Sequence, residues 1–336
     1  MNAGTPSTAE MVEMSYARAI NAALAEEMER DERVFLMGQD VGKLGGVFGV
    51  TKGLQQRFGP QRVIDTAIVE HAIVGGAAGA AMAGMRPVAE VQFADFLLLA
   101  GDETASKLGK WRFMHGGRLT VPVVVRAPMG AQGGVGAEHS QCLEGVFWHT
   151  GGLRIVVPST PADAKGLLKT AIRSDDPVLF FEHRRLYRAR GPVPVDPDVV
   201  VPFGQAAVRR SGRDVTLVTW SALVEDCVRA AEQLAERGVS AEVLDLRTLQ
   251  PLDRTSLAES IGRTGRVIVV HEAAKTAGPG AEIAAIVAEE FFPLLRAPVR
   301  RVCGYDAPVP QSGVLEAMWL PSVDEIATAA EELVAW

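Results

Sequence analysis

The sequence contains little cysteine and no segment typical of a membrane span. Its three cysteines, Cys142, Cys227 and Cys303, are far apart and form no C-x-x-C pair, which argues against a disulfide framework. The uncharged run at residues 72–85 is shorter than the roughly 20 residues that a membrane-spanning helix needs. The chain does not begin with basic residues followed by an apolar segment, which is the pattern that would indicate a secretory leader. We therefore expect a cytoplasmic protein that does not enter a membrane.

Basic residues are also in the minority. The chain has 34 Lys and Arg against 41 Asp and Glu, for a formal net charge of −7. Proteins that bind nucleic acids or anionic membranes need a basic face, so this balance argues against both kinds of partner. Apolar residues make up 48% of the chain, which suits a soluble globular protein with a large core. The 336 residues exceed the roughly 100–200 of a typical domain, so two domains are expected.

Short valine-rich segments alternate with amphipathic segments along most of the chain. Within residues 14–30, for example, Ile20, Leu24 and Met28 have the spacing of an amphipathic helix. Strands that alternate with helices in this way predict parallel sheets covered by helices on both faces. The predicted fold is therefore α/β, with two doubly wound domains. A proline-rich linker at 191–203 is predicted to separate residues 1–190 from residues 204–336.

Residues 63–93 predict a strand, a helix and a second strand, with Glu70 at the N-terminus of the helix. The helix is rich in small residues, and Gly75, Gly76 and Gly79 each cost roughly 1 kcal/mol relative to Ala in a helix interior. Close approach of another helix or of a ligand is the usual reason for such a composition. Glu70 is then either an ordinary acid at the positive end of a helix dipole or a functional group in an apolar setting.

Two glycine-rich segments, 38–53 and 129–142, follow predicted strands. The first lacks both the G-x-x-x-x-G-K-[ST] and the G-x-G-x-x-G phosphate-binding patterns, so it predicts a flexible loop at the surface or beside a cofactor. The second contains His139. Loops between rigid elements often carry catalytic groups, but a histidine in a loop is also commonly just exposed.

Short motifs along the chain, taken in order, resemble the beta subunit of the thiamine-diphosphate-dependent component of 2-oxo acid dehydrogenase complexes (pyruvate, branched-chain or acetoin type). The resemblance extends from about Met14 to Glu331. Its motifs are Gly45-Gly46-Val47-Phe48, Asp65 to Glu70, Arg86-Pro87-Val88-Ala89-Glu90-Val91-Gln92-Phe93, His139-Ser140-Gln141, Val157-Pro158-Ser159-Thr160-Pro161, Asp245-Leu246-Arg247-Thr248-Leu249, Pro251-Leu252-Asp253 and Asp306 to Pro310. Any one motif is weak, but this many in order make a specific match.

The resemblance implies a transketolase-like architecture, with a domain that binds the pyrimidine ring of thiamine diphosphate and a C-terminal transketolase domain. It also implies an α2β2 heterotetramer in which the alpha subunit holds magnesium and the diphosphate, in keeping with the absence of a GDG motif here. The implied reaction decarboxylates a 2-oxo acid and transfers the acyl group to lipoamide on an acyltransferase core. The alternatives are a split transketolase-like enzyme and a non-catalytic scaffold subunit.

The resemblance also assigns roles to single residues. Glu70 would favour the reactive tautomer of the aminopyrimidine, and His139 would act as an acid or base near the substrate and the lipoyl arm. The other neighbours of the pyrimidine ring would be Ile68, Gln92 and Phe96. A potassium ion would be held by Val123, Ala171, Ile172, Ser174 and Asp176, although residues 174–177 also suit an ordinary turn.

Three places depart from the family pattern. Gln39 stands where relatives have an acid, in a chain of acids thought to pass protons between two active sites. The sequence DETAS at 102–106 replaces the more usual D-Q-I-x-N. His71 follows Glu70 where Gly, Gln or Met is commoner. The sequence therefore leaves open both the proton coupling and the identity of the 2-oxo acid.

Overall fold

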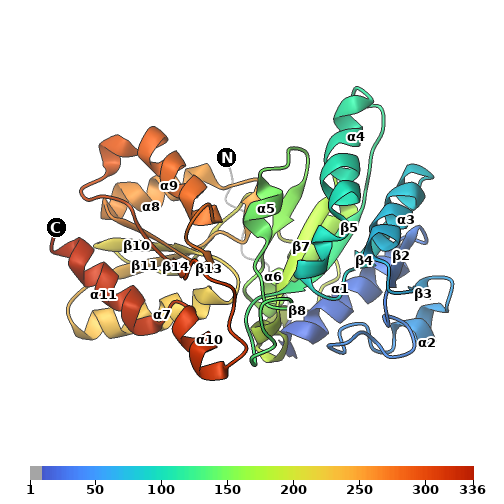
Figure 1. Cartoon of the computed structure of the whole chain (residues 1–336), viewed down its shortest axis with the longest axis horizontal. Helices are drawn as coiled ribbons and strands as arrows, with labels where there is room; N and C mark the ends of the chain where they lie inside the picture. The colour runs from blue at the N-terminus through green and yellow to red at the C-terminus, as the bar shows by residue number, and fades with distance from the viewer. Residues whose placement is uncertain (1–9) are drawn as a thin grey trace.

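The computed structural model describes residues 10–336, which fold into two α/β units that lie side by side (Figure 1). The strands of the first unit are β1 (Met11–Ser15), β2 (Val34–Gly38), β3 (Val63–Asp65), β4 (Arg86–Glu90), β5 (Val124–Met129), β6 (Arg154–Val156), β7 (Val178–His183) and β8 (Arg190–Pro194). Its helices are α1 (Tyr16–Arg30), α2 (Leu54–Phe58), α3 (Glu70–Met82), η1 (Ala94–Leu98), η2 (Asp102–Leu108), α4 (Gly109–Met114), α5 (Glu144–Trp148), α6 (Pro161–Arg173) and η3 (Arg184–Arg188).

The second unit continues the alternation of strands and helices. Its strands are β9 (Ala207–Arg210), β10 (Val215–Thr219), β11 (Ala241–Asp245), β12 (Thr248–Gln250), β13 (Val267–Ala274) and β14 (Arg300–Gly304). Its helices are α7 (Leu223–Glu236), α8 (Arg254–Thr264), α9 (Pro279–Glu290), η4 (Phe292–Leu294), α10 (Gly313–Trp319) and α11 (Val323–Val334). The predicted α/β class with two doubly wound sheets is confirmed.

The first sheet has seven strands in the order β12-β6-β7-β5-β4-β2-β3, and the second has five in the order β14-β13-β10-β11-β9. All neighbours are parallel except the edge pairs β12–β6 and β11–β9. In the first sheet, Gly38 at the end of β2 lies opposite both Asp65 and Glu90, the last residues of β3 and β4. Because these strands are parallel, the loops that follow them leave from one edge of the sheet.

Helices bury both faces of each sheet. Helices α1 and α6 pack against one face of the first sheet through residues such as Leu24 and Leu168, and α3 packs against the other through Val74 and Ala78. In the second sheet, α7 and α11 share a core on one face. Helices α8 and α9 cover its other face, and their core continues into the first unit. One core therefore joins the two units.

The helix starts follow ordinary capping chemistry. Ser15 accepts a hydrogen bond from the backbone of Arg18 at the start of α1, as its predicted N-cap role requires. Thr160 caps α6 just before Pro161. The cap of α3 is different, because Val69 offers no side-chain acceptor and Glu70 is the first helical residue. Its exposed Gly76 and Gly79 leave part of one face of α3 uncovered by this chain.

Three local features differ from the sequence-based expectations. The start of the proposed linker is a strand, since β8 pairs with β1 in a separate two-stranded sheet. Strand β12 follows the linker but joins the first sheet, where it pairs with β6. The sequence of residues 97–115 predicts a single helix, but the structure has a 3-10 turn, a π-helical segment and the short helix α4. A turn at residues 99–100 separates the first two and changes the hydrogen-bond pattern.

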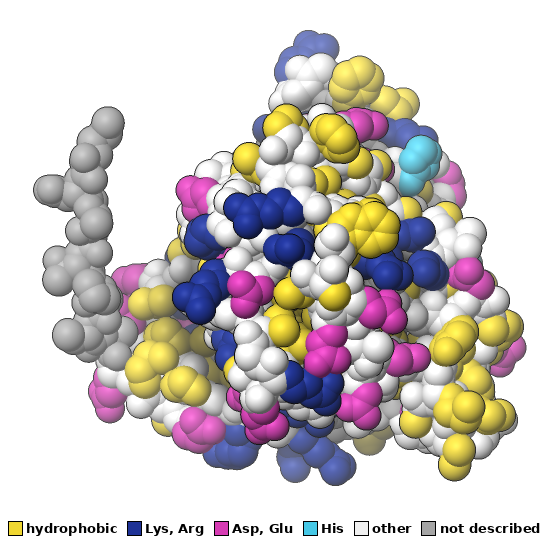
Figure 2. Space-filling view, turned by 90° about the vertical axis from the view of Figure 1, so that its left-hand side faces the viewer, with side chains coloured by type: hydrophobic (Ala, Val, Ile, Leu, Met, Phe, Trp, Pro, Cys, Tyr) yellow, Lys and Arg dark blue, Asp and Glu magenta, His cyan; other side chains and the backbone are white. Residues whose placement is uncertain are grey.

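The face of the molecule formed mainly by the second unit carries charges of both signs. Figure 2 shows lysine and arginine side chains interspersed with aspartate and glutamate there, rather than gathered by sign. Ion pairs such as Arg300 with Glu332 and Arg237 with Glu331 account for part of this mixing. Among residues 10–336, no helix combines the length and apolar character needed to cross a membrane.

Candidate active site

The residues assigned to the cofactor gather at one edge of the first sheet. Ile68 and Glu70 follow β3, Gln92 and Phe96 follow β4, and the loop with His139 follows β5. These strands are parallel, so all three loops leave from their carboxyl ends. In open α/β sheets this edge is where ligands bind. The topology therefore brings together residues that lie far apart in the sequence, such as Ile68 and His139.

Glu70 occupies the first position of α3 and is half-buried. Its carboxylate forms no hydrogen bond or ion pair with residues 10–336. It faces the positive end of the helix dipole, which favours an anion at this point. Because Glu70 closes no capping contact, its carboxylate is available to a group outside this chain. Nearby Ile68 is 67% exposed, so its side chain is equally uncovered.

An aromatic cluster lies beside this edge. The ring centroid of His139 is 4.7 Å from that of Phe93 and 5.4 Å from that of Phe96, both in edge-to-face geometry. Phe48, from the first glycine-rich loop, packs edge-on against Phe93 at 5.7 Å. The loop histidine is therefore half-buried between two phenylalanines rather than simply exposed. Each edge-to-face aromatic pair of this kind stabilises the fold by about 0.5–1.5 kcal/mol beyond what the burial of its surface contributes.

Gln92, which follows β4, carries an unpaired polar atom at this edge. Its amide nitrogen is buried and has no hydrogen-bond acceptor in the described part of the chain. A buried donor without a partner costs about 1–3 kcal/mol, and native proteins rarely leave one unpaired. An acceptor from a bound group would satisfy it.

Side chains at its two ends fix the loop of residues 129–142. Arg184 donates through Nε to the carbonyl of Gly130 at 3.1 Å, and its Nη2 lies 3.4 Å from the hydroxyl of Ser140. The same guanidinium lies over the ring of Phe93 at 5.5 Å. At the C-terminal end, Gln141 donates to Asp95 Oδ1 through its side chain at 2.9 Å. The loop is thereby tied to the strand edge and to the aromatic cluster.

A buried ionic cluster beneath the site escaped the sequence analysis. Arg126 lies on β5 between Glu90 of β4 and Glu182 of β7, and its guanidinium bonds the two carboxylates at 2.5 and 2.6 Å. Tyr187 donates its hydroxyl to Glu182 at 2.9 Å. Burial raises the pKa of Glu90, and the charge of Arg126 only partly opposes that shift. The sequence did hold a signal for this cluster, because each of three apolar strands contains one charged residue. Such residues are unusual in strands that are buried on both faces of a sheet.

Cys142, His183 and Glu272 come close enough to suggest a metal centre, but their hydrogen bonds argue against one. His183 Nδ1 accepts a hydrogen bond from the backbone N–H of Arg185 at 3.2 Å, which places the ring proton on Nε2. That Nε2–H donates to Glu272 at 2.7 Å. Neither ring nitrogen is then free to bind an ion. Burial, followed by the charges of Glu272 and Glu144, raises the pKa of the Cys142 thiol and disfavours the thiolate that a metal needs.

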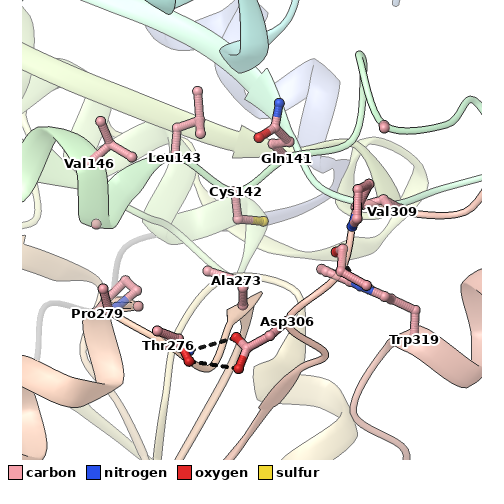
Figure 3. A pocket seen from close by; sticks show the side chains of 17 residues that line it. Gln141, Cys142, Leu143, Val146, Ala273, Thr276, Pro279, Asp306, Val309 and Trp319 are labelled. Carbon is pink, nitrogen blue, oxygen red and sulfur yellow. Dashed lines mark hydrogen bonds between the residues drawn. The ribbon is translucent and has the colours of Figure 1, made fainter.

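The far side of the same loop faces the second unit across a cavity of about 630 Å³. Figure 3 shows Gln141, Cys142 and Leu143 on one wall, with Asp306 and Trp319 opposite. Thr276 donates to both oxygens of Asp306, through its N–H and its hydroxyl, at 2.7 Å each. These bonds lower the pKa of the Asp306 carboxyl. The cavity therefore lies where the two units meet, next to the loop that carries His139.

A second buried acid lies at this joint. Glu144 opens α5, and its Oε1 accepts a hydrogen bond from the indole of Trp220 at 3.1 Å, while its other oxygen has no partner among the described residues. Burial raises the pKa of Glu144 to about 7. Trp220 in turn stacks on His271 at 5.4 Å. Glu144 is therefore a buried acid with one paired and one unpaired oxygen.

The five positions assigned to potassium lie around the C-terminus of α6 and the starts of β5 and β7. The carbonyls of Ile172 and Ser174 accept hydrogen bonds from Arg86 at 2.9 and 2.6 Å. The carboxylate of Asp176 pairs with Arg154 at 2.6 Å and also with Arg112. A cation bound here would share these oxygens with guanidinium groups, using the second lone pair of each carbonyl.

The two helix-covered sheets, with loops gathered at the carboxyl edge of the first, are the architecture of a two-domain protein of the transketolase class. Residues 12–190 match the family "Transketolase, pyrimidine binding domain", and residues 204–326 match "Transketolase, C-terminal domain". A solved structure described as "Split gene transketolase, inactive beta4 tetramer" aligns with a TM-score of 0.79 and 23% identity, covering 96% of this chain and 98% of that one. This likeness establishes the fold.

Closer relatives specify the family within that class. The chain is 48% identical to the 2-oxoisovalerate dehydrogenase subunit beta of Bacillus subtilis, over 95% of this chain and 98% of the relative. It is 44% identical to the pyruvate dehydrogenase E1 component subunit beta of Staphylococcus epidermidis, over 96% and 98%. It is also 44% identical to the acetoin:2,6-dichlorophenolindophenol oxidoreductase subunit beta of Cupriavidus necator, over 95% and 97%. The chain belongs to the beta subunits of thiamine-diphosphate-dependent 2-oxo acid dehydrogenase components, which confirms the resemblance.

Proposed function

We propose that this chain is the beta subunit of a 2-oxo acid dehydrogenase component and works with an alpha subunit. The reaction would decarboxylate a 2-oxo acid and pass the acyl group to lipoamide. Carbon dioxide leaves in the decarboxylation. In the transfer that follows, the S–S bond of the lipoyl dithiolane breaks and is reduced, one sulfur takes the acyl group and the other takes a proton. The observation that carries the proposal is the match to relatives with this named role over nearly the whole chain, at up to 48% identity.

Thiamine diphosphate, when bound, would supply the nucleophilic carbon that adds to the carbonyl of the 2-oxo acid. We infer that Glu70 would hydrogen-bond a ring nitrogen of its aminopyrimidine. Gln92 would donate its unpaired amide proton to another ring acceptor, and Phe96 would pack on the ring face. Ile68 would cover the remaining edge. Magnesium and the diphosphate would be held by the alpha subunit, in an α2β2 heterotetramer that docks on a lipoyl acyltransferase core.

His139 would serve the later half of the reaction. Its imidazole is held by ring contacts alone, and a neutral imidazole in such a setting can give or take a proton. Near the substrate carbonyl it would donate a proton or accept one as the acyl group moves to sulfur. Glu70 and His139 come from different loops at one edge of the sheet. Separate steps can therefore use separate groups, one at the cofactor and one at the substrate.

A split transketolase-like enzyme and a scaffold subunit remain the competing proposals. The fold suits a transketolase, but the named roles of the relatives favour the dehydrogenase. A scaffold would have no reason to keep an unpaired buried amide on Gln92 or a histidine packed between Phe93 and Phe96. A cytoplasmic location also stays a prediction.

The proposed function predicts activity that depends on a partner. The chain alone is expected to bind thiamine diphosphate and magnesium weakly, because the diphosphate ligands are absent, and to turn over no 2-oxo acid. With the alpha subunit encoded in the same genome, it should acylate a lipoyl domain. His139→Ala should lower that acylation by about a hundredfold while leaving the melting temperature nearly unchanged. Titration calorimetry measures the binding of the cofactor, and a lipoyl-domain assay measures the acylation. Micromolar cofactor binding by the chain alone, or normal acylation by the alanine variant, would contradict this assignment.

We also propose that potassium binds at the turn after α6. The support is that the five predicted ligands lie around the end of α6 and the starts of β5 and β7. Potassium bound only to the folded state should raise the melting temperature, and the gain should grow with the logarithm of its concentration once the concentration exceeds the dissociation constant. The expected result is a higher melting temperature in potassium chloride than in tetramethylammonium chloride at equal ionic strength. Equal values in the two salts would remove potassium from this site.

A further inference from the structure

The loop that carries His139 is contacted by the second unit as well as by the first. The backbone N–H of Gly134, near the tip of the loop, donates to Glu316 Oε2 at 3.0 Å. The N–H of Ala131, at its base, donates to Glu272 Oε1 at 2.5 Å. Glu316 lies on α10 and Glu272 on β13. Two carboxylates from the second unit therefore accept hydrogen bonds from a loop of the first.

The contact at the tip is close and largely shielded from water. Glu316 is only 7% exposed, although α10 is a short helix near the surface. Gly134 adopts φ +67°, and a Cβ there would lie 2.4 Å from the carbonyl oxygen of Gln311. Only glycine allows the loop to approach the segment just before α10 this closely. Trp319, at the other end of α10, packs with Ala131, so the helix touches the loop at two points.

The position of His139 depends on this backbone. Its imidazole forms no hydrogen bond within residues 10–336 and is held only by edge contacts with Phe93 and Phe96. The preceding residues Gly133, Gly134 and Gly136 all have positive φ, a conformation that a free chain leaves easily. A carboxylate that accepts from an N–H forms a stronger, charge-assisted bond than a neutral acceptor. Fixing the N–H of Gly134 therefore restricts the segment that leads to His139.

We propose that Glu316 is a positioning residue for acyl transfer, through which the C-terminal domain holds the tip of the His139 loop. Glu316 touches neither the cofactor edge nor the aromatic cluster, and it acts through the backbone of Gly134. The inference rests on the proposed function of His139. It gives the second domain a part in the chemistry, since the loop is shaped by contacts from both domains.

The test uses the chain assembled with its alpha subunit. Glu316→Ala removes the acceptor, and Glu316→Gln keeps an uncharged acceptor of the same length. Glu289→Ala is the matched control, because Glu289 is an exposed acid of the same domain that pairs with no other described residue. Glu272 is unsuited to the purpose, since it also accepts the hydrogen bond from His183 that helps join the two units. His139→Ala serves as the reference for a lost imidazole.

Two measurements are made on each variant. The first is hydrogen exchange of the loop amides by mass spectrometry, which reports the Gly134 contact without any catalysis. The second compares acylation of a lipoyl domain with decarboxylation driven by an artificial dye oxidant, which does not need the lipoyl arm. For Glu316→Ala we expect loop exchange about tenfold faster and acylation lowered about tenfold to a hundredfold, with dye-linked decarboxylation within about twofold of wild type. Glu316→Gln should lie between Glu316→Ala and wild type, and Glu289→Ala should match wild type.

The outcomes separate this inference from the proposed function. Unchanged loop exchange in Glu316→Ala, or unchanged acylation despite faster exchange, would overturn the positioning role. Equal losses in the dye-linked and lipoyl assays would also overturn it, because they indicate a general structural defect. If Glu316→Ala does not assemble, Glu316→Gln decides by the same two readouts, and wild-type exchange in it counts against the proposal. Normal acylation by His139→Ala would instead reject the function proposed for that histidine, whatever the exchange shows.

Discussion

Arg126→Met is expected to lower the free energy of unfolding by about 3–5 kcal/mol at neutral pH, the largest loss that a single substitution should cause here. Arg126 is fully buried and bonds two carboxylates, so its removal leaves Glu90 and Glu182 without a cation. Burial alone would lower the pKa of Arg126, but its bonds to Glu182 and Glu90 outweigh that effect and raise it. Methionine fills a similar volume, so the loss should reflect the stranded charges rather than a cavity.

The deficit should also depend on pH. Without Arg126, the pKa of Glu90 in the folded protein should rise further above its unfolded value, because the cation that opposes the effect of burial is gone. A raised carboxyl pKa makes the folded state bind more protons, so stability is lost as pH increases. Denaturant unfolding of Arg126→Met should therefore show a smaller deficit near about pH 5.5 than near about pH 8. The control is Arg300→Met, which breaks a surface pair with Glu332 and should cost at most about 1 kcal/mol. Similar costs for the two variants would contradict the stranded-charge explanation.

Glu70→Gln is expected to lower 2-oxo acid turnover by several orders of magnitude, while the protein still folds and assembles. If Glu70 acted only at the helix dipole, the change would cost about 0.3–1 kcal/mol of stability and activity would survive. A glutamine amide has nearly the same shape, but it cannot exchange a proton with a ring nitrogen. Glu32→Gln, at an exposed acid of the same domain, is the control and should behave as wild type. A melting temperature near wild type separates the loss of activity from unfolding.

The sequence predicted the fold well because its signals were local. Valine-rich strands and the spacing of Ile20, Leu24 and Met28 each specify an element without reference to the rest of the chain. The strand β8, which extends into the proposed linker, was missed because Pro192 and Pro194 argued against it. Prolines are tolerated there because β8 is one of only two strands in its sheet and both are edges.

The resemblance predicts the residues of the site one by one, but it does not predict the contacts that support them. Glu70, Gln92, Phe96 and His139 could be placed on loops after strands, and parallel strands bring such loops to one edge. Nothing in the sequence indicated that Glu316 contacts Gly134, because the two are separated by most of the chain and join different domains. The same holds for the cluster around Arg126, where three charges on separate strands meet only after the sheet forms.

The central claim is that Glu70 acts on the cofactor. Its most direct test is the rate of hydrogen–deuterium exchange at the thiazolium carbon of thiamine diphosphate, measured in the chain assembled with its alpha subunit. Exchange reports activation of the cofactor before any substrate binds, so it does not depend on His139 or on the identity of the 2-oxo acid. We predict that exchange in Glu70→Gln falls by orders of magnitude below that of wild type and of Glu32→Gln. Exchange as fast as wild type would contradict the role of Glu70 and the catalytic account built on it.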